Sequence, residues 1–554
     1  MADPAELVFV PLGGLGEIGM NAALYGYGPP RRREWLLVDL GVAFAGEDMP
    51  GVDLIMPALG FIEQQKERLA GIVLTHAHED HFGAVADLWP RLGVPLYATQ
   101  FAADLLEARR LSEKGAPKVP IRRIGQATRF SVGPFDLETV PVAHSIPESC
   151  ALILRTPAGT VVHTGDWKID PTPVLGLPTD EARFRAIGDE GVLALVCDST
   201  NILREGESAS ERQVADALKE IIAGSPGRVL VTTFASNVAR IRAVAEAAAA
   251  CGRQVIIAGR AMERVAEIAA ELGMFSGLPP FRGPDAYQSL PRDKVVVLVT
   301  GSQGEPRAAL ARIAAGEYPD VRLASGDRVI FSSRAIPGNE KAINRIINAL
   351  ARQDIEIITD RHGLVHVSGH PRRDEVRRMY EWVRPKIAIP AHGEALHLTE
   401  HRAFARSMGV DHAIRAFNGD LVRLAPGDPV IVQEVPHGRL VKDGMLITEE
   451  TGAVAERRKL AYVGIVTVAF AIDERGEFAS DPEIETTGIP ETTADGTVIA
   501  ELALDAVEAA VRSLGKARRR DVSAVQEAVR RAVRSAIADV WDKKPVCQVF
   551  VLDV

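Results

Sequence analysis

The sequence has few cysteines, few aromatic residues and no long apolar run, and these shortages exclude several classes of protein. Its four cysteines, Cys150, Cys197, Cys251 and Cys547, are scattered over 554 residues with no Cys-x-x-Cys pair. This spacing disfavours a disulfide scaffold and predicts a cytoplasmic protein. No stretch approaches the roughly 18 apolar residues of a membrane span, and the first residues do not resemble an export signal, so we expect neither.

The chain also lacks an excess of positive charge. Its 64 Lys and Arg against 74 Asp and Glu give a formal net charge of -10. Because non-specific affinity for nucleic acid comes from neutralising phosphates, any such contact must be local. Aromatic residues make up only 5% and form no stripe, so base stacking is not expected to dominate. Basic clusters, each also typical of an ordinary solvated surface, are Arg31-Arg32-Arg33, Arg372-Arg373 with Arg377-Arg378, Lys516 to Arg520, and Arg530-Arg531.

The chain is too long for one hydrophobic core and should divide into domains. Residues 1–208 alternate apolar strands with polar strand ends, whereas 209–360 place Ala/Glu/Arg helices between apolar strands, the βαβ pattern of a parallel sheet. The strand-end pattern returns in 361–427, so the middle region is interpreted as an insertion. We expect a linker at 428–456 and a small α+β domain at 457–554, with strands around a turn, two amphipathic helices and a final strand.

The strongest chemical signal is His76-Ala-His78-Glu-Asp80-His81, directly after the apolar segment GIVLT. Alternate histidines on an extended segment point the same way, and Asp80-His81 stand at the turn into a helix. Imidazole and carboxylate groups suit Zn²⁺, which at a catalytic site keeps three protein ligands and a water. One cluster serves two adjacent metals only if further ligands arrive from elsewhere in the chain.

Three other strand ends supply such ligands: His144 in VPVAHSIPES, Asp166 in HTGDWK and His392 in IPAHGE. A lone histidine at a strand end is more often a hydrogen-bonded structural residue, but the cluster favours function here. His163, just before Thr164-Gly165-Asp166, is superfluous once these places are filled, and we interpret it as structural.

The order His-x-His-x-Asp-His, His and His-Thr-Gly-Asp resembles the metallo-β-lactamase superfamily. Asp198 in CDST, His370 in VSGHP and His392 in PAHGE resemble motifs A, B and C of its β-CASP branch. The segments PLGGLGEIGMN, FSSRAIPGNE and VHVSGHP, with the C-terminal domain, are similar to bacterial ribonuclease J over nearly the full length. The resemblance implies an α/β fold, a metallo-β-lactamase αββα sandwich with an inserted α/β β-CASP domain and a small α+β C-terminal domain.

The resemblance also implies two Zn²⁺ per chain, with Mn²⁺ or Mg²⁺ as alternative occupants. It assigns His76, His78 and His144 to one ion, Asp80, His81 and His392 to the other, and Asp166 as the bridge. Asp39 in LLVDLG matches a motif whose carboxylate orients a metal-ligating histidine, although it could instead cap the turn before Gly41.

By the same resemblance the chain is a metal-dependent ribonuclease that hydrolyses RNA phosphodiesters with a two-zinc-activated hydroxide, leaving a 5′-phosphate and a 3′-hydroxyl. It would be a 5′-to-3′ exonuclease that prefers 5′-monophosphate ends and also an endonuclease, in rRNA processing and mRNA decay. The expected catalytic residues are Asp80, His370 and Asp198, with His370 assisting at the phosphorus or the departing oxygen.

The resemblance further implies that two loops contact single-stranded RNA with a 5′-monophosphate. It also implies a homodimer or homotetramer, for which the C-terminal domain is the best candidate. Ser332, Ser333 and Arg334 either face RNA as well or form an ordinary exit from a strand. The residues expected to bind substrate are Ser236, Asn237, His366, Val367, Ser368, Gly369 and His370.

Two alternatives stay open. A metallo-β-lactamase-fold hydrolase acting on a thioester, a lactam or a transfer-RNA 3′ end would share the zinc cluster but would not need Asp198, His370 and the insertion. A silent RNA-binding scaffold subunit of a degradation complex would keep the fold but would be expected to have lost ligands.

Overall fold

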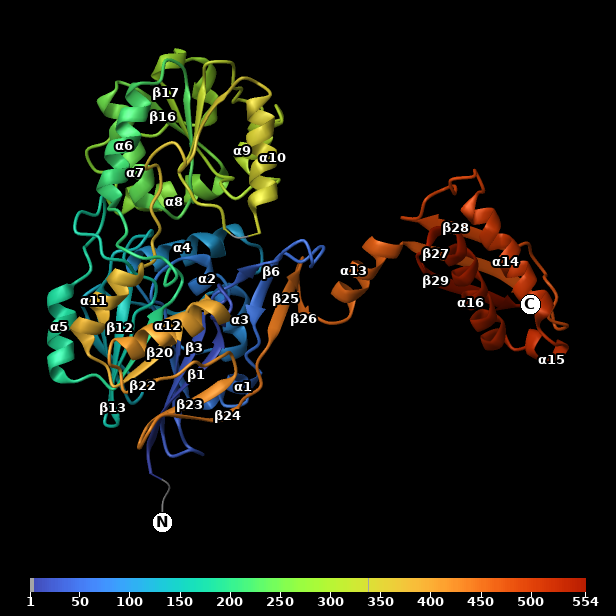
Figure 1. Ribbon diagram of the computed structural model, residues 1–554, viewed down its shortest axis with the longest axis horizontal. Coiled ribbons are helices and arrows are strands. Elements are labelled where there is room, and N and C mark those ends of the chain that lie inside the picture. The colour runs from blue at the N-terminus through green and yellow to red at the C-terminus, as the bar shows by residue number, and fades with distance from the viewer. Residues whose placement is uncertain (1–3, 337) are drawn as a thin grey trace. The chain divides into compact units, whose positions relative to one another are not determined.

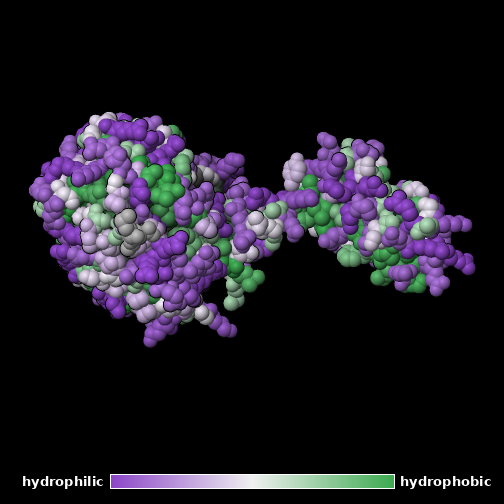
Figure 2. All heavy atoms as spheres, turned by 90° about the horizontal axis from the view of Figure 1, so that it is seen from below, coloured by the Kyte–Doolittle hydropathy of each residue, from purple (hydrophilic) through white to green (hydrophobic). Residues whose placement is uncertain are grey.

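A computed structural model describes residues 4–336 and 338–554, which divide into two compact units. One unit contains the chain up to Ala43 and Ile55–Arg439, and the other contains Phe44–Leu54 and Leu440–Val554. Among the described residues, no helix has the length and apolar character needed to span a membrane. Hydrophilic residues predominate on the face drawn in Figure 2, with smaller hydrophobic patches between them.

The first unit contains a sandwich of two large sheets. Side chains of both sheets, including Phe9, Leu36, Leu152 and Val196, meet in one buried core. The strands of the first sheet, in spatial order, are β24 (Val430–Glu434), β23 (Asp420–Ala425), β1 (Glu6–Gly13), β3 (Ala22–Gly28), β4 (Glu34–Val38), β7 (Leu69–Val73), β8 (Leu96–Ala98) and β9 (Ile121–Arg123). Those of the second are β10 (Arg129–Val132), β11 (Phe135–Pro141), β12 (Cys150–Thr156), β13 (Gly159–His163), β14 (Ala194–Asp198), β20 (Ile387–Ala391) and β22 (His412–Ala413).

Helices cover the outer side of the second sheet. Phe184, Val376, Trp382 and Phe404 on three helices pack against strand residues such as Ile153. Because both faces are covered, strands such as β14 and β20 are buried along their whole length and read as continuous apolar runs. The helices are α5 (Glu181–Glu190), α11 (Arg373–Val383) and α12 (Ala395–Ser407), and those that follow strands of the first sheet are α2 (Glu79–Phe82), α3 (Val85–Leu92) and α4 (Gln100–Ser112).

The middle of the chain forms an inserted α/β domain with its own parallel sheet and core. It leaves the sandwich after β14 and returns before β20, and these two strands are parallel neighbours. Figure 1 draws this domain in green and yellow. Its strands, in spatial order, are β16 (Gln254–Ala258), β17 (Val295–Val299), β15 (Val229–Thr232), β18 (Arg328–Phe331) and β19 (Glu356–Ile358). Its helices are α6 (Glu211–Ala223), α7 (Val238–Ala250), α8 (Arg260–Glu271), α9 (Ala309–Ala314) and α10 (Glu340–Ala351).

The second unit is a small α+β domain, as the sequence predicts. Its sheet runs β28 (Glu483–Thr487), β27 (Ile465–Ile472), β29 (Val546–Asp553), and alternate residues of β27 are buried against α14 (Ile499–Ser513) and α16 (Val522–Trp541). A helix, α13 (Ala453–Val463), precedes β27. The segment 428–456, expected as a linker, contains the short strands β24, β25 (Arg439–Asp443) and β26 (Leu446–Glu449), and the two units divide inside it.

Candidate metal centre

The histidine cluster follows β7 on an extended segment that turns into α2. His78 has extended backbone angles, and His81 lies inside the one-turn helix with its side chain buried. The backbone of this turn packs tightly on Gly41, where an added Cβ would lie 1.7 Å from the carbonyl oxygen of Asp80. Only glycine permits this approach.

The remaining predicted ligands come from the ends of other strands and point into the same region. His144 follows β11, Asp166 follows β13 and His392 follows β20. His392 has a positive φ of 51°, a conformation that costs about 1 kcal/mol or more for a residue other than glycine and that is concentrated at functional sites. Strands far apart in the sequence thus deliver one set of side chains.

These side chains form two groups that share one carboxylate oxygen. In the first group, His78 Nδ1 lies 3.1 Å from His76 Nε2 and 2.9 Å from His144 Nε2. Asp166 Oδ2 lies 3.8 Å from His76 Nε2 and 3.7 Å from His144 Nε2. Each group holds its ligand atoms within 4.8 Å of one another. The first group is therefore three imidazole nitrogens facing one carboxylate oxygen.

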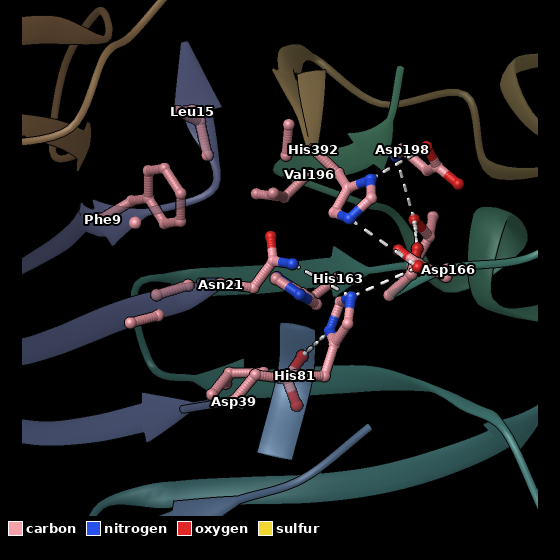
Figure 3. A pocket seen from close by; sticks show the side chains of 17 residues that line it. Phe9, Leu15, Asn21, Asp39, His81, His163, Asp166, Val196, Asp198 and His392 are labelled. Atoms are coloured by element: carbon pink, nitrogen blue, oxygen red, sulfur yellow. Dashed lines mark hydrogen bonds and ion pairs between the residues drawn. The ribbon is translucent and has the colours of Figure 1, made fainter. Parts of the chain in front are cut away.

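In the second group Asp166 Oδ2 lies 3.2 Å from His81 Nε2 and 3.8 Å from His392 Nε2. Asp80 Oδ2 completes it, 3.7 Å from His81 Nε2 and 3.1 Å from His392 Nε2. Figure 3 shows His81, Asp166 and His392 around the pocket, with a dashed line joining Asp39 to His81. A shared carboxylate oxygen is the arrangement expected of a residue that bridges two cations.

The second ring nitrogen of each histidine that presents Nε2 has its own partner. His81 Nδ1 lies 2.7 Å from Asp39 Oδ2, the contact expected for Asp39, and His144 Nδ1 lies 2.7 Å from the Gly369 carbonyl oxygen. These acceptors require a proton on Nδ1 and leave Nε2 bare for a metal. The other two Nδ1 atoms meet threonine hydroxyls, His76 at Thr75 (3.0 Å) and His392 at Thr200 (2.7 Å).

Both threonines support the same tautomer. Thr75 Oγ1 donates to Asp39 Oδ2 at 2.9 Å, and Thr200 Oγ1 donates to the His392 carbonyl oxygen at 3.2 Å. Because each hydroxyl proton is used in that way, the hydroxyl oxygen is free to accept from Nδ1–H of the histidine beside it. Four imidazoles are thus fixed with Nε2 directed at the cluster.

The protonation states of three histidines of the cluster suit divalent cations. Burial lowers the pKa of His78 to about 4, and burial together with neighbouring imidazoles holds the pKa of His76 and His144 well below the usual value. These three are neutral at pH 7, the form that binds metal. Burial opposes the charged form of His81 as well, yet Asp166 and Asp80 hold its pKa well above normal.

One atom of the cluster lacks a partner within the described residues. Asp166 is 2% exposed, and its Oδ1 has no hydrogen bond there. Buried carboxylate oxygens are normally paired or coordinate a cation, because an unpaired buried charge is costly. The residues present therefore fit a divalent metal centre.

His370 and Asp198 form a pair at the side of this cluster. His370 Nδ1 lies 2.7 Å from Asp198 Oδ2 and 3.8 Å from Asp166 Oδ2. Although burial lowers it, the charges of Asp198 and then Asp166 raise the pKa of His370 to about 9. The predicted pair is thus present, and in this state its imidazole carries a proton at neutral pH.

The two predicted substrate loops differ in how their side chains are used. Ser368 Oγ accepts from Asn201 Nδ2 (2.9 Å) and from the His370 amide (3.2 Å), beside the cluster. Asn237 instead uses its Oδ1 as the N-cap of α7, accepting from the Arg240 amide, and Ser236 precedes it partly exposed. At the exit from β18, Ser332 and Ser333 are buried and Arg334 is exposed.

Several residues of the site escaped prediction. Thr75 and Thr200 contact histidines that are predicted to be ligands, and Asn201 also donates to the His370 carbonyl oxygen at 3.1 Å. Asn21 donates to the Asp80 carbonyl oxygen at 3.0 Å; its place at the end of PLGGLGEIGMN was the available signal. His163 belongs to none of the ligand groups of the described chain; its Nδ1 lies 2.9 Å from the Tyr25 hydroxyl, and burial lowers its pKa to about 4.

Comparison with known proteins places this architecture. Four family models match successive parts of the chain: a beta-lactamase superfamily domain at 34–185, the ribonuclease J beta-CASP domain at 226–350, a Zn-dependent metallo-hydrolase RNA specificity domain at 354–415 and the ribonuclease J C-terminal domain at 452–554. A crystal structure of a protein of unknown function from Enterococcus faecalis matches with a TM-score of 0.53 at 16% identity, covering 76% of this chain and all of that one, which shows the fold alone.

Fold and site together define a metallo-β-lactamase-fold hydrolase with a β-CASP insertion. Ribonuclease J of Sinorhizobium meliloti is 55% identical over all of this chain and 98% of that protein, and ribonuclease J of Thermus thermophilus is 36% identical over 94% and 88%. The chain belongs to the ribonuclease J family and is a metal-dependent ribonuclease, with RNA as its substrate.

Proposed function

We propose that the centre takes two zinc ions and that the protein is a 5′-to-3′ exonuclease preferring 5′-monophosphate ends, which also cuts RNA internally, in RNA maturation and decay. The proposal of two ions rests on one observation: Asp166 Oδ2 belongs to two ligand groups. Mn²⁺ or Mg²⁺ are the alternative occupants. His76, His78 and His144 would hold one ion and Asp80, His81 and His392 the other, with Asp166 between them.

The chain's own residues supply orientation and a proton. When bound, two divalent ions lower the pKa of a nearby water and stabilise the charge that develops on phosphodiester oxygens. The imidazolium of His370, held by Asp198, is placed to donate a hydrogen bond to a phosphate oxygen or a proton to the departing 3′-oxygen. Asp80 would contribute as a metal ligand, since its Oδ2 lies 3.1 Å from His392 Nε2 in the same ligand group.

The preference for a 5′-monophosphate is supported by the loop His366–His370 beside the cluster. The Ser368 side chain offers a hydroxyl to a phosphate oxygen, and the missing Cβ of Gly369 lets the loop pack on His144, since an added Cβ would lie 2.6 Å from His144 Nδ1. A phosphate bound by this loop, next to the candidate metal centre, would bring the first internucleotide bond to the cutting site. The loop Ser236-Asn237 would contribute mainly backbone groups, since the Asn237 oxygen caps α7.

The direct test supplies the full-length protein with one RNA carrying either a 5′-monophosphate or a 5′-triphosphate, with and without a chelator. We expect chelator-sensitive release of mononucleotides, faster for the monophosphate, together with some internal fragments. Internal fragments alone would refute the exonuclease proposal. No cleavage with metal present would favour a scaffold subunit, although this chain retains all seven predicted ligand residues.

Ser368→Phe should impair handling of 5′-monophosphate RNA more than internal cleavage. The bulky ring cannot accept the bonds from Asn201 and the His370 amide, so the loop must move. Loss of the hydrogen bond that the Ser368 hydroxyl would donate to the charged 5′-phosphate is worth about 1.5–3 kcal/mol, or roughly ten- to hundred-fold in KM. Steady-state kinetics on both RNAs would measure this, with Ser276→Phe, at an exposed site of the insertion, as the control. Equal loss on both RNAs would contradict the assignment.

Self-association through the C-terminal domain, as a homodimer or homotetramer, is also proposed. Helices cover one face of the sheet β28-β27-β29, whereas Phe550 and Leu552 on the other face are 54% and 65% exposed beside Ala469 and Ala471. Phe550→Asp with Leu552→Asp should lower the mass measured by light scattering, whereas Leu177→Asp, at an exposed position in the first unit, should not. An unchanged mass in the double variant would exclude this face.

Four cysteines without a disulfide fit the proposed cytoplasmic location.

A further inference from the structure

A completely buried arginine lies in the inserted domain, away from the metal ligands. Arg240 on α7 is 0% exposed. Its Nε and Nη2 donate to Glu211 Oε2 at 3.3 and 2.9 Å, and its Nη1 donates to the carbonyl oxygens of Ser332 (3.2 Å) and Val365 (3.0 Å). Arginine is almost never fully buried unless it is paired in this way. The planar guanidinium thus joins three segments of the chain.

The local fold fixes Arg240 firmly. Its amide donates to Asn237 Oδ1 in the N-cap of α7, so it stands one turn beyond the loop Ser236-Asn237. Ser332, directly after β18, holds the same carbonyl oxygen of Val365, because its hydroxyl donates to it at 2.6 Å. Two donors from the insertion therefore converge on the first residue of the segment Val365–His370.

That segment is held at its other end by the sandwich. Asn201 donates to Ser368 and to the His370 carbonyl oxygen, His370 meets Asp198, and the Gly369 carbonyl oxygen meets His144. No helix or strand of the described chain includes this segment. Its position therefore depends on two separate anchors, Arg240 with Ser332 on the insertion side and the metal-site residues on the other.

Glu211 continues the connection toward the sandwich. Its amide donates to Asp170 Oδ2 at 2.8 Å, and Asp170 pairs with Lys168 at 3.0 Å, both with side chains 1% exposed. Lys168 lies two residues after Asp166. Because an unpaired buried charge is costly, this chain of contacts favours one discrete placement of the insertion's loop relative to the metal site.

We propose that Arg240 is a positioning residue for RNA: it holds the segment Val365–Ser368 in its binding position and thereby sets KM, without taking part in the chemistry. The inference rests on the proposed role of this segment in binding RNA. The metal-side anchor remains when Arg240 is lost, so kcat and metal content should be preserved. This separation of KM from kcat distinguishes positioning from general loss of structure.

The test compares Arg240→Met and Arg240→Lys with Arg253→Met in the full-length protein. Arg253 is a matched control, since it is 7% exposed in the same domain and donates to the carbonyl oxygens of Gly227 and Ser225 instead. Lysine can keep the pair with Glu211 but cannot reproduce the planar fork. Both Arg240 variants should raise hydrogen exchange in a peptide covering 363–368 and raise KM for RNA about tenfold, with kcat and zinc content within about twofold.

Each outcome decides a separate point. Unchanged exchange in 363–368, or the same change in Arg253→Met, would overturn the positioning role. Raised exchange with unchanged KM would leave Arg240 as an anchor but overturn its link to RNA and the proposed binding role of the segment. Where Arg240→Met does not fold, Ser332→Ala provides the second variant, because it removes the other bond to the Val365 carbonyl oxygen. Ser332→Ala should also raise hydrogen exchange in 363–368 and KM for RNA, each by less than the Arg240 variants.

Discussion

Asp166→Asn is expected to abolish RNA cleavage, with kcat reduced by about 10⁴-fold or more. Asp166 Oδ2 is the only atom in both main ligand groups of the described residues, so an amide at this position would disturb both at once. The metals would supply several kcal/mol of transition-state stabilisation. A loss of about 5.4 kcal/mol in transition-state stabilisation corresponds to a factor of about 10⁴ in kcat. Asparagine has the same shape, so the effect reports charge and coordination and not a cavity.

The measurement combines single-turnover cleavage, zinc content by elemental analysis and the thermal unfolding midpoint. His163→Asn is the matched control, because His163 lies three residues before Asp166 and lines the same pocket (Figure 3). Its Nδ1 contacts the Tyr25 hydroxyl and not a ligand group. The control should keep its zinc. Full activity in Asp166→Asn would refute the proposed mechanism. Zinc loss in His163→Asn would show that the interpretation of His163 as structural is wrong.

The residue types of the metal centre could be predicted from the sequence because each follows an apolar strand. The partners of their second ring nitrogens could not. Thr200 and His392 are 192 positions apart, and Gly369 and His144 are 225 apart, with a backbone carbonyl that has no signature in the sequence. Threonines are common beside strand ends, so only the folded sheet order identifies those that hold a histidine.

The insertion was predictable because its helices and strands alternate with clear periodicity, and because the strand-end histidines return after it. The strands within 428–456 were missed since each has only four or five residues, too few for a pattern. Asn237 illustrates a different limit. Asparagine is both a helix N-cap and a hydrogen-bonding ligand, and the structure commits its oxygen to the cap, which the order of residues alone does not reveal.

His370→Gln and Asp198→Asn should each lower kcat by about 10²- to 10⁴-fold, the range expected for loss of a positioned proton donor. The double variant should lose little more than either single variant. His370 Nδ1 and Asp198 Oδ2 are 2.7 Å apart, and Asp198 has the further task of accepting from the Thr200 amide at Oδ1 (2.8 Å), which asparagine can still do. Residues that act as one unit are strongly non-additive.

Zinc content separates this role from metal binding. Asp166, Asp198, His370 and His392 also form a third group with ligand atoms within 4.8 Å, so the pair could instead hold a cation. As a proton donor and its carboxylate partner, the two residues should be replaceable without loss of zinc. Thr200→Val should instead lose zinc. It removes the partner of His392 Nδ1, and we expect it to weaken zinc binding about 10- to 100-fold. Additive losses in the double variant, or zinc loss in either single one, would assign His370 and Asp198 to the metal centre itself.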